Sequence, residues 1–263
     1  MRSLEWATLA YCAYCCVIAL AHPSLPARRR AAVALGAIAI GSLAAWAPAA
    51  PWRDTFALRD WILPAAVYLL GGYYLSGLFY VAPMPRVERR LVALDRRLAA
   101  ATWSARLPAG LLELLELSYL AVYAMVGLGP LVAYAAAGAA EVERFWIIVL
   151  TADYICFACM PWAQTRTPRA LEGNPPASRS RVRRLNLAVL GRFSHERNTF
   201  PSGHAAEALA VVLALAHISP SVSLALAPLA LAVGAGSVAG RYHFAADAIA
   251  GYLVALVVWL AFG

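Results

Sequence analysis

Two short polar clusters, separated by almost uninterrupted apolar sequence, contain the side chains best suited to chemistry. The first is Asn198-Thr199-Phe200-Pro201-Ser202-Gly203-His204, and the second is Gly240-Arg241-Tyr242-His243-Phe244-Ala245-Ala246-Asp247. Their histidines, arginine and aspartate lie at the ends of hydrophobic segments, and a charge at the centre of a bilayer costs roughly 2.5 to 3.5 kcal/mol on insertion scales. Polar groups retained at that cost are candidates for catalysis or binding.

The first cluster has the pattern of a helix start that binds an anion. Pro201 suits the first helical position, because its missing N–H is not needed there, and Asn198-Thr199 supplies a capping side chain. The amides of Ser202, Gly203 and His204 would then point into the loop, at the positive end of the helix dipole. Gly203 allows a phosphate to approach the backbone closely, and His204 is placed to protonate one of its oxygens.

The second cluster pairs a histidine with an aspartate four residues later. That spacing puts His243 and Asp247 on one helical face. The aspartate can hold the imidazole in one tautomer and stabilise its cationic form. His243 could then act as a nucleophile toward phosphorus, with Arg241 binding the phosphoryl oxygens. A purely structural His–Asp pair at a helix end remains an alternative for this cluster taken alone.

The elements that must position these residues are membrane spans. In 263 residues, 62% are hydrophobic and 14% are charged, against about 25% charged in average soluble domains. A span needs about 20 apolar residues. We therefore predict an all-α, polytopic membrane helix bundle with about eight spans, near residues 4–21, 31–48, 58–80, 111–137, 144–161, 203–219, 221–239 and 244–262.

The positive charge of the chain is concentrated in the predicted loops. The net charge is +8, and the chain contains no lysine, so all of its fixed basic side chains are arginines. Arginines in the loops of a membrane protein favour anionic headgroups and phosphate-bearing substrates as partners, since the guanidinium matches phosphate geometry. We do not expect nucleic acid as a partner.

The predicted spans bring the two clusters to one membrane face. One span precedes the long polar stretch 162–200, two follow between 203 and 239, and one follows His243, so both clusters face the same side. Arg166 and Arg169 enter that side from the end of the fifth span and could supply further phosphate contacts. This coincidence favours a functional site over two separate structural ones.

Other segments carry weaker signals. Residues 1–52 form two spans with few polar residues and are predicted to be an accessory two-helix hairpin, with the core at 53–263. Residues 86–98 alternate apolar and charged positions at helical spacing, which predicts an amphipathic helix lying in the membrane interface. Glu113 and Glu116 share a helical face and could form an acid/base set, although a structural role is more common near the end of a span.

The two clusters resemble signature motifs of the type 2 phosphatidic acid phosphatase superfamily. Thr199 to His204 resembles its second motif, Gly240 to Asp247 its third, and Arg166-Thr167-Pro168-Arg169 a form of its first. The likeness extends over residues 58–263, the six-span core of that superfamily. Residues 91–95, with Tyr119 and Tyr123, resemble the subgroup that contains inositol phosphorylceramide synthases.

This resemblance implies a role for each matching residue. His243 would form a phosphohistidine, Asp247 would orient it, and His204 would protonate the leaving alcohol. The phosphoryl group would be bound by Ser202, Gly203, Arg166, Arg169 and Arg241, and neither a metal nor another cofactor is implied. The chain departs from the family pattern in two places: a lysine is absent from the first motif, and Gly236 and Ser237 stand where the third motif usually has Ser-Arg, so Arg241 would substitute.

The expected activity is a lipid phosphate phosphatase that cleaves a phosphomonoester or diphosphate. Transfer of a phospho-headgroup to an acceptor alcohol shares the same covalent step and is the first alternative. A non-enzymatic anion or lipid transporter is the second, and it predicts charged residues at mid-depth in several spans. The superfamily's precedent places the active site on the non-cytoplasmic face of the cell membrane, whereas the arginine distribution favours the opposite orientation.

Overall fold

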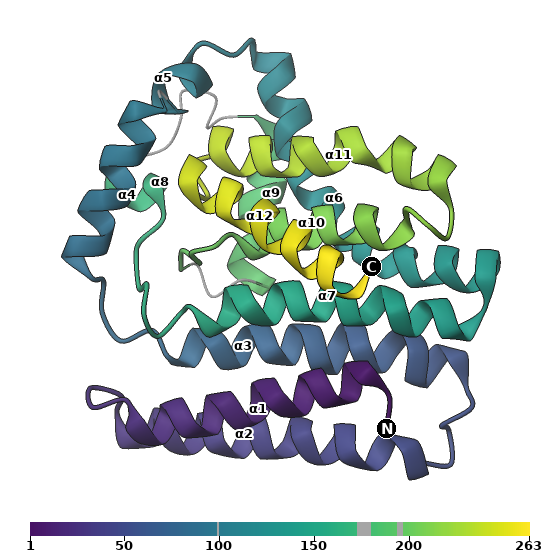
Figure 1. Cartoon of the computed structure of the whole chain (residues 1–263). Helices are drawn as coiled ribbons and strands as arrows, with labels where there is room; N and C mark the ends of the chain where they lie inside the picture. Colours follow the sequence, from purple (N-terminus) through teal and green to yellow (C-terminus); the bar gives the residue numbers. More distant parts are fainter. Residues whose placement is uncertain (99, 173–179, 194–196) are drawn as a thin grey trace.

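The chain folds into a bundle of helices in the computed structural model, which describes residues 1–98, 100–172, 180–193 and 197–263 (Figure 1). Within these ranges there is no β-sheet, and a single β-bridge joins Thr165 to Asn198. The elements are α1 (Ser3–Ala21), α2 (Ala27–Trp46), η1 (Ala47–Ala49), η2 (Phe56–Leu69), α3 (Leu70–Leu78), α4 (Pro85–Arg97), α5 (Ala100–Ala105), α6 (Ala109–Ala137), α7 (Ala139–Ala158), α8 (Pro168–Glu172), α9 (Arg181–Phe193), α10 (Gly203–Leu215), α11 (Pro220–Ala239) and α12 (Ala245–Phe262). The predicted all-α polytopic bundle is confirmed.

All eight predicted spans are helical, and they differ in how they suit a membrane. Six helices of the described chain are long and apolar enough to cross one: α1, α2 with η1, η2 with α3, α6, α11 and α12. The other two are α7, which carries four charged residues, and α10, which has only 13 residues. Most residues of α7 and α10 are buried against other helices, so neither needs the length or composition of a lipid-facing span.

The N-terminal hairpin packs along α3 and α7 through buried polar contacts (Figure 1). The Thr8 and Tyr154 hydroxyls lie 3.0 Å apart, and the Tyr11 hydroxyl donates to the Gly72 carbonyl at 3.0 Å. The same hydrophobic core cluster includes residues of this hairpin and of the C-terminal helices. The division into an accessory unit 1–52 and a core 53–263 stays a prediction.

The predicted interfacial helix is α4, which crosses the ends of the bundle helices (Figure 1). An amphipathic pattern predicts that the apolar residues of this helix are buried and the charged ones exposed, and α4 departs from that prediction. Glu88 and Asp95 are buried against the protein together with Leu91, whereas Leu94 and Leu98 are exposed. The acidic side chains point inward because arginines of the neighbouring loops bind them.

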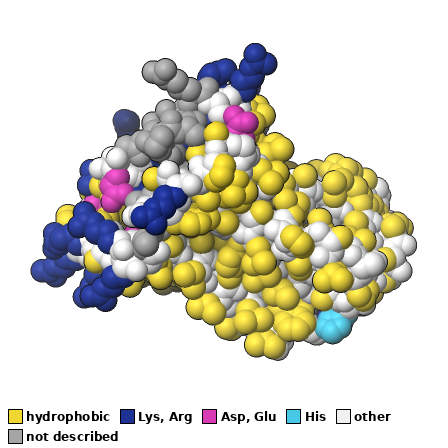
Figure 2. Space-filling view, turned by 90° about the horizontal axis from the view of Figure 1, so that it is seen from above, with side chains coloured by type: hydrophobic (Ala, Val, Ile, Leu, Met, Phe, Trp, Pro, Cys, Tyr) yellow, Lys and Arg dark blue, Asp and Glu magenta, His cyan; other side chains and the backbone are white. Residues whose placement is uncertain are grey.

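Arginine side chains gather at the end of the molecule where α4 and α8 lie, and the rest of the visible face is mostly hydrophobic (Figure 2). The helix order places the segments 22–26, 79–98, 100–108, 159–172, 180–193, 197–202 and 240–244 at this same end. The two polar clusters are therefore at one end of the bundle, as the predicted topology requires.

Candidate active site

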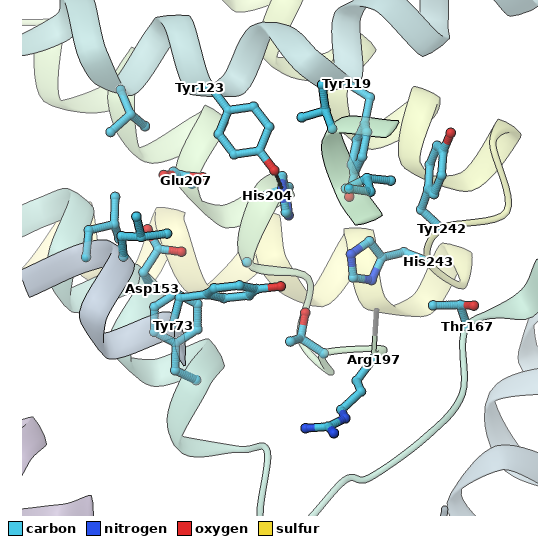
Figure 3. Close-up of a pocket in the computed structure, with 18 of the residues that line it drawn as sticks. Tyr73, Tyr119, Tyr123, Asp153, Thr167, Arg197, His204, Glu207, Tyr242 and His243 are labelled. Atoms are coloured by element: carbon cyan, nitrogen blue, oxygen red, sulfur yellow. Dashed lines mark hydrogen bonds between the residues drawn. The ribbon is translucent and has the colours of Figure 1, made fainter. Parts of the chain in front are cut away.

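A cavity of about 500 Å³ opens beneath the arginine-rich end of the bundle (Figure 3). Its walls come from η2, α3, α6, α7, α8, α9 and α10, and from the loops before α8, α10 and α12. The polar and aromatic lining residues are Tyr73, Tyr119, Tyr123, Asp153, Phe157, Thr167, Arg169, Arg197, Thr199, His204, Glu207, Tyr242 and His243. Both predicted histidines therefore face one space.

The start of α10 differs from the predicted start in its register. Ser202, not Asn198 or Thr199, is the N-cap, and its Oγ accepts a bond from Ala205 N at 3.4 Å. The helix begins at Gly203, two residues after Pro201, because the Ser202 amide donates to the Asp247 carbonyl at 2.9 Å. Ser202 is fully buried as a capping residue, and Gly203 and His204 of the first turn line the cavity.

His243 and Asp247 face each other across the start of α12. His243 Nδ1 lies 3.6 Å from Asp247 Oδ2, slightly beyond hydrogen-bond distance, and Oδ2 also accepts from Phe244 N at 2.9 Å. The amides of Tyr242 and His243 both donate to the Ser237 carbonyl, at 2.9 and 3.1 Å, which fixes the turn. With Nδ1 directed to the carboxylate, Nε2 is the ring nitrogen that remains for a ligand.

His204 lies opposite His243, with 6.3 Å between the ring centroids. Its ring stacks on Tyr119 at 4.9 Å and meets Tyr123 edge-on at 5.6 Å. The Tyr123 hydroxyl lies 3.2 Å from His204 Nε2 (Figure 3). The two tyrosines noted in the sequence thus position one of the two histidines.

The predicted arginines do not all lie in the cavity. Arg169 lines it, over the Tyr242 ring at 5.1 Å, and its Nη1 is buried without a hydrogen-bond partner among the described residues. Arg166 instead donates to Glu88, with bonds of 3.0 and 2.9 Å. The pKa of Glu88 is lowered, first by this hydrogen bond to the guanidinium.

Arg241 is likewise engaged by carboxylates. Its guanidinium binds Asp95 at 2.7 Å and also Glu172, and it is almost fully buried. Its backbone has φ 59°, in the left-handed region that non-glycine residues adopt rarely. In this structure Arg166 and Arg241 thus hold α4 and α8 in place rather than line the cavity.

Sequence patterns did not single out Arg197 as a site residue. It lies just before the first cluster, lines the cavity, and sits over the Tyr80 ring at 4.9 Å. Its pKa is lowered, mainly by burial and then by the charge of Arg29. The only signal available in the sequence was its position in the arginine-rich stretch, which it shares with many other arginines.

Glu116, one of the two carboxylates noted in α6, has a structural role near the site. Glu116 is buried and accepts from Tyr242 Oη at 2.6 Å, from Asn186 Nδ2 at 2.6 Å and from Arg183. Burial raises the pKa of the Tyr242 hydroxyl. Through Tyr242 this network fixes the residue that precedes His243, which agrees with a structural role for Glu116.

The comparison with protein families agrees with the geometry. Residues 158–262 match the PAP2 superfamily. The match covers less than half of the chain and includes both polar clusters, Arg166 and Arg169, and it supports assignment to the type 2 phosphatidic acid phosphatase superfamily. Members of the PAP2 superfamily are phosphatases or related phosphotransferases, so an enzyme acting on phosphoric esters is supported. No curated protein and no solved structure matches the chain.

Proposed function

We propose that this protein is a membrane lipid phosphate phosphatase that works through a phosphohistidine on His243. The observation that carries this proposal is the placement of His243 and His204 on opposite sides of one cavity, 6.3 Å apart, with Asp247 behind His243. A phosphoryl group between the two rings would meet a nucleophile on one side and a proton donor on the other.

The reaction would proceed in two balanced steps. In the first, His243 Nε2 bonds to phosphorus, the bond from phosphorus to the leaving alcohol oxygen breaks, and His204 gives that oxygen a proton. In the second, a water oxygen bonds to phosphorus, the bond between phosphorus and His243 Nε2 breaks, His204 takes a proton from the water, and inorganic phosphate leaves. Asp247 is a positioning residue, because it holds the Nδ1 side of His243 and stabilises the ring while it is cationic.

Binding of the phosphoryl oxygens is assigned to groups that line the cavity. Arg169 has a buried Nη1 without a partner among the described residues. Arg197, from the loop before α10, also lines the cavity, although its guanidinium points away from His243 and donates to the Gly77 carbonyl (Figure 3). The Gly203 amide lies at the positive end of α10, where a helix start favours an anion. This set replaces Arg166, Arg241 and the Ser202 side chain, which are engaged elsewhere. Catalysis through it uses no metal.

A test of the mechanism traps the covalent intermediate. Purified protein is incubated with a phosphorus-labelled lipid phosphate and denatured in alkali, because phosphohistidine is labile in acid. Wild type should carry label, and His243→Ala should carry none and lose turnover by at least about 10³-fold. His217→Ala is the matched control, since His217 is exposed and stacks on Trp259, outside the cavity lining.

Two results would contradict the proposal. One is turnover by His243→Ala within tenfold of wild type in protein that is still folded. The other is loss of activity on strong chelation with recovery on adding magnesium or zinc, which would require metal-assisted chemistry instead.

Phosphotransfer is the second candidate function. It is favoured by the placement of Tyr119 and Tyr123 against His204, because these tyrosines carry the resemblance to the inositol phosphorylceramide synthase subgroup. An acceptor alcohol would replace water in the second step. Addition of acceptor alcohols to the same assay separates the two, since transfer produces a new phosphoester at the expense of inorganic phosphate.

A further inference from the structure

Buried carboxylates in this protein follow a consistent pattern. Seven acidic side chains are buried in the described part of the chain, and six of them lie within 4.0 Å of an arginine or histidine nitrogen: Glu5, Asp60, Glu88, Asp95, Glu116 and Asp247. A buried charge without a partner is costly, which explains these pairs. The seventh, Asp153 in α7, has no such cation among the described residues.

Asp153 lines the catalytic cavity rather than a closed core. Its side chain is about 1% exposed, and its Oδ2 has no hydrogen-bond partner among the described residues. Glu207 lines the same cavity and interacts electrostatically with Asp153. Figure 3 shows both carboxyl groups at the end of the cavity away from His243. A cation between the two carboxyl groups would be attracted by both of them.

Aromatic rings enclose the same end of the cavity. Tyr73 and Phe157 meet edge-on with centroids 5.7 Å apart, and Tyr123 completes the wall beside Glu207 (Figure 3). Carboxylates combined with aromatic faces are the groups that bind ammonium ions, because the ring face attracts a cation while the carboxylate neutralises it.

The acidic pair also lies close to the expected phosphate position. A Cβ on Gly203 would be 3.4 Å from Asp153 Oδ1, and Glu207 follows His204 by three residues on the same face of α10. A carboxylate here would oppose phosphate binding unless the substrate itself brings a positive charge.

We propose that Asp153 and Glu207 form a subsite for an ammonium group on the alcohol part of the substrate. The preferred substrate would be the phosphoester of an amino alcohol that bears an apolar chain. Its phosphoryl group lies between the histidines, its ammonium between the two carboxylates, and its chain against the apolar cavity wall. This inference rests on the proposed function and concerns the substrate class of the same site.

The test compares three phosphomonoesters of equal chain length: a 2-amino alcohol, its neutral N-acetyl derivative and the corresponding 2-hydroxy compound. Release of the alcohol gives kcat/KM for each. Wild type should prefer the amine over the N-acetyl ester by roughly 10- to 100-fold, the effect of one charge-assisted hydrogen bond. Asp153→Asn should bring that ratio to within about threefold, and Glu207→Gln should lower it.

Glu113→Gln is the matched control, because Glu113 is a partly exposed acid of α6 that does not line the cavity, and it should leave the ratio unchanged. The unphosphorylated amino alcohol, added as a competitor, should inhibit wild type more strongly than its N-acetyl form does. This second measurement needs no variant, so it keeps the proposal testable where Asp153→Asn does not fold.

The outcomes separate this inference from the proposed function. Equal turnover of amine and N-acetyl esters by wild type, with equal inhibition by the two free alcohols, would overturn the ammonium subsite and leave the phosphatase mechanism intact. A preference for the 2-hydroxy ester that Asp153→Asn removes would assign the pair to a polyol instead. Absence of turnover and of phosphoenzyme with all three esters would refute the proposed function and this inference together.

Discussion

At the scale of single residues, the two histidines have different surroundings, and on this difference we base the different steps that we propose for them. His243 has a carboxylate near its Nδ1 and lines the cavity, as the proposed nucleophile requires. The Tyr123 hydroxyl lies 3.2 Å from His204 Nε2. A neutral partner of this kind suits a group that gives and takes one proton in each cycle.

Replacement of His204 should therefore depend on the leaving group. His204→Ala should slow phosphoenzyme formation from alkyl phosphates by roughly 10²- to 10⁴-fold, the usual contribution of general acid catalysis. The loss should be much smaller for an aryl phosphate, whose phenolate leaves without a proton. Rapid-quench rates for both esters give the comparison. A loss of equal size for both would indicate a structural role for His204.

The choice between the arginines can be tested with vanadate, which takes a trigonal-bipyramidal form that resembles the transferring phosphoryl group. Arg169→Lys should weaken vanadate inhibition by about tenfold or more, because an ammonium cannot reproduce the two-pronged contact of a guanidinium. Arg166→Lys is the matched control from the same motif and should change it little. The assignment fails if the two substitutions have equal effects on inhibition.

At the scale of elements, α4 joins the loops that carry the site. Asp95 binds the Arg241 guanidinium and also accepts from Ala245 N, the first amide of α12, at 2.9 Å. One carboxylate thus holds both sides of the turn that contains His243. The left-handed backbone of Arg241 depends on such contacts, because a non-glycine residue gains nothing from that conformation by itself.

Removal of Asp95 should destabilise the protein. Asp95→Ala leaves Arg241 with a buried charge that, among the described residues, Glu172 alone compensates, so the free energy of unfolding should fall by about 3 to 5 kcal/mol. Asp54→Ala is the control, because Asp54 forms an exposed pair with Arg53, and it should change stability by less than about 1 kcal/mol. Unfolding in detergent micelles, followed by circular dichroism, measures both. Similar losses in the two variants would contradict the bridging role of Asp95.

The contact between Glu88 and Arg166 predicts a dependence of stability on acid pH. The folded-state pKa of Glu88 lies below its ordinary value of 4.5, so the pair stabilises the fold above that pH. This contribution should disappear as the pH falls through the lowered pKa. Wild type should therefore lose more melting temperature between pH 6 and pH 3 than Glu88→Gln or Arg166→Gln. Parallel curves for all three proteins would show that the pair does not contribute.

At the scale of the whole molecule, the cavity lies at the arginine-rich end. This end could face either the cytoplasm or the opposite side of the membrane. A phosphate-binding site requires arginines on whichever side of the membrane it lies. The number of arginines at this end therefore does not by itself show, by the positive-inside rule, that this end faces the cytoplasm. We propose, in line with the resemblance, that this end faces away from the cytoplasm.

Labelling of intact cells with a membrane-impermeant maleimide tests that orientation. Ala170 in α8 and Ala140 at the start of α7 are both exposed and lie at opposite ends of the bundle. In a parent with the partly exposed Cys16 and Cys159 replaced by alanine, Ala170→Cys should react and Ala140→Cys should not. The reverse pattern would place the active site on the cytoplasmic side.

The sequence by itself determined the features that depend on local physics. Apolar runs of span length predicted the eight helical segments, six of which are long and apolar enough to cross a membrane, because a bilayer selects for length and hydrophobicity in each segment separately. The alternation of those helices placed His204 and His243 at one end of the bundle. The motif spacing also identified the His243–Asp247 pair, since residues four apart near a helix start lie on one face.

Only the tertiary structure decided which of the many charged residues face the cavity. Arg166 and Arg169 are three residues apart in one motif, yet Arg166 binds Glu88 of α4 and Arg169 lines the cavity. In the sequence, Asp153 is an isolated charge within a predicted span. In the structure, Glu207 of α10 lines the same cavity. An ion pair or a cavity wall depends on residues distant in sequence that meet only after the helices pack, and helical periodicity carries no information about such partners.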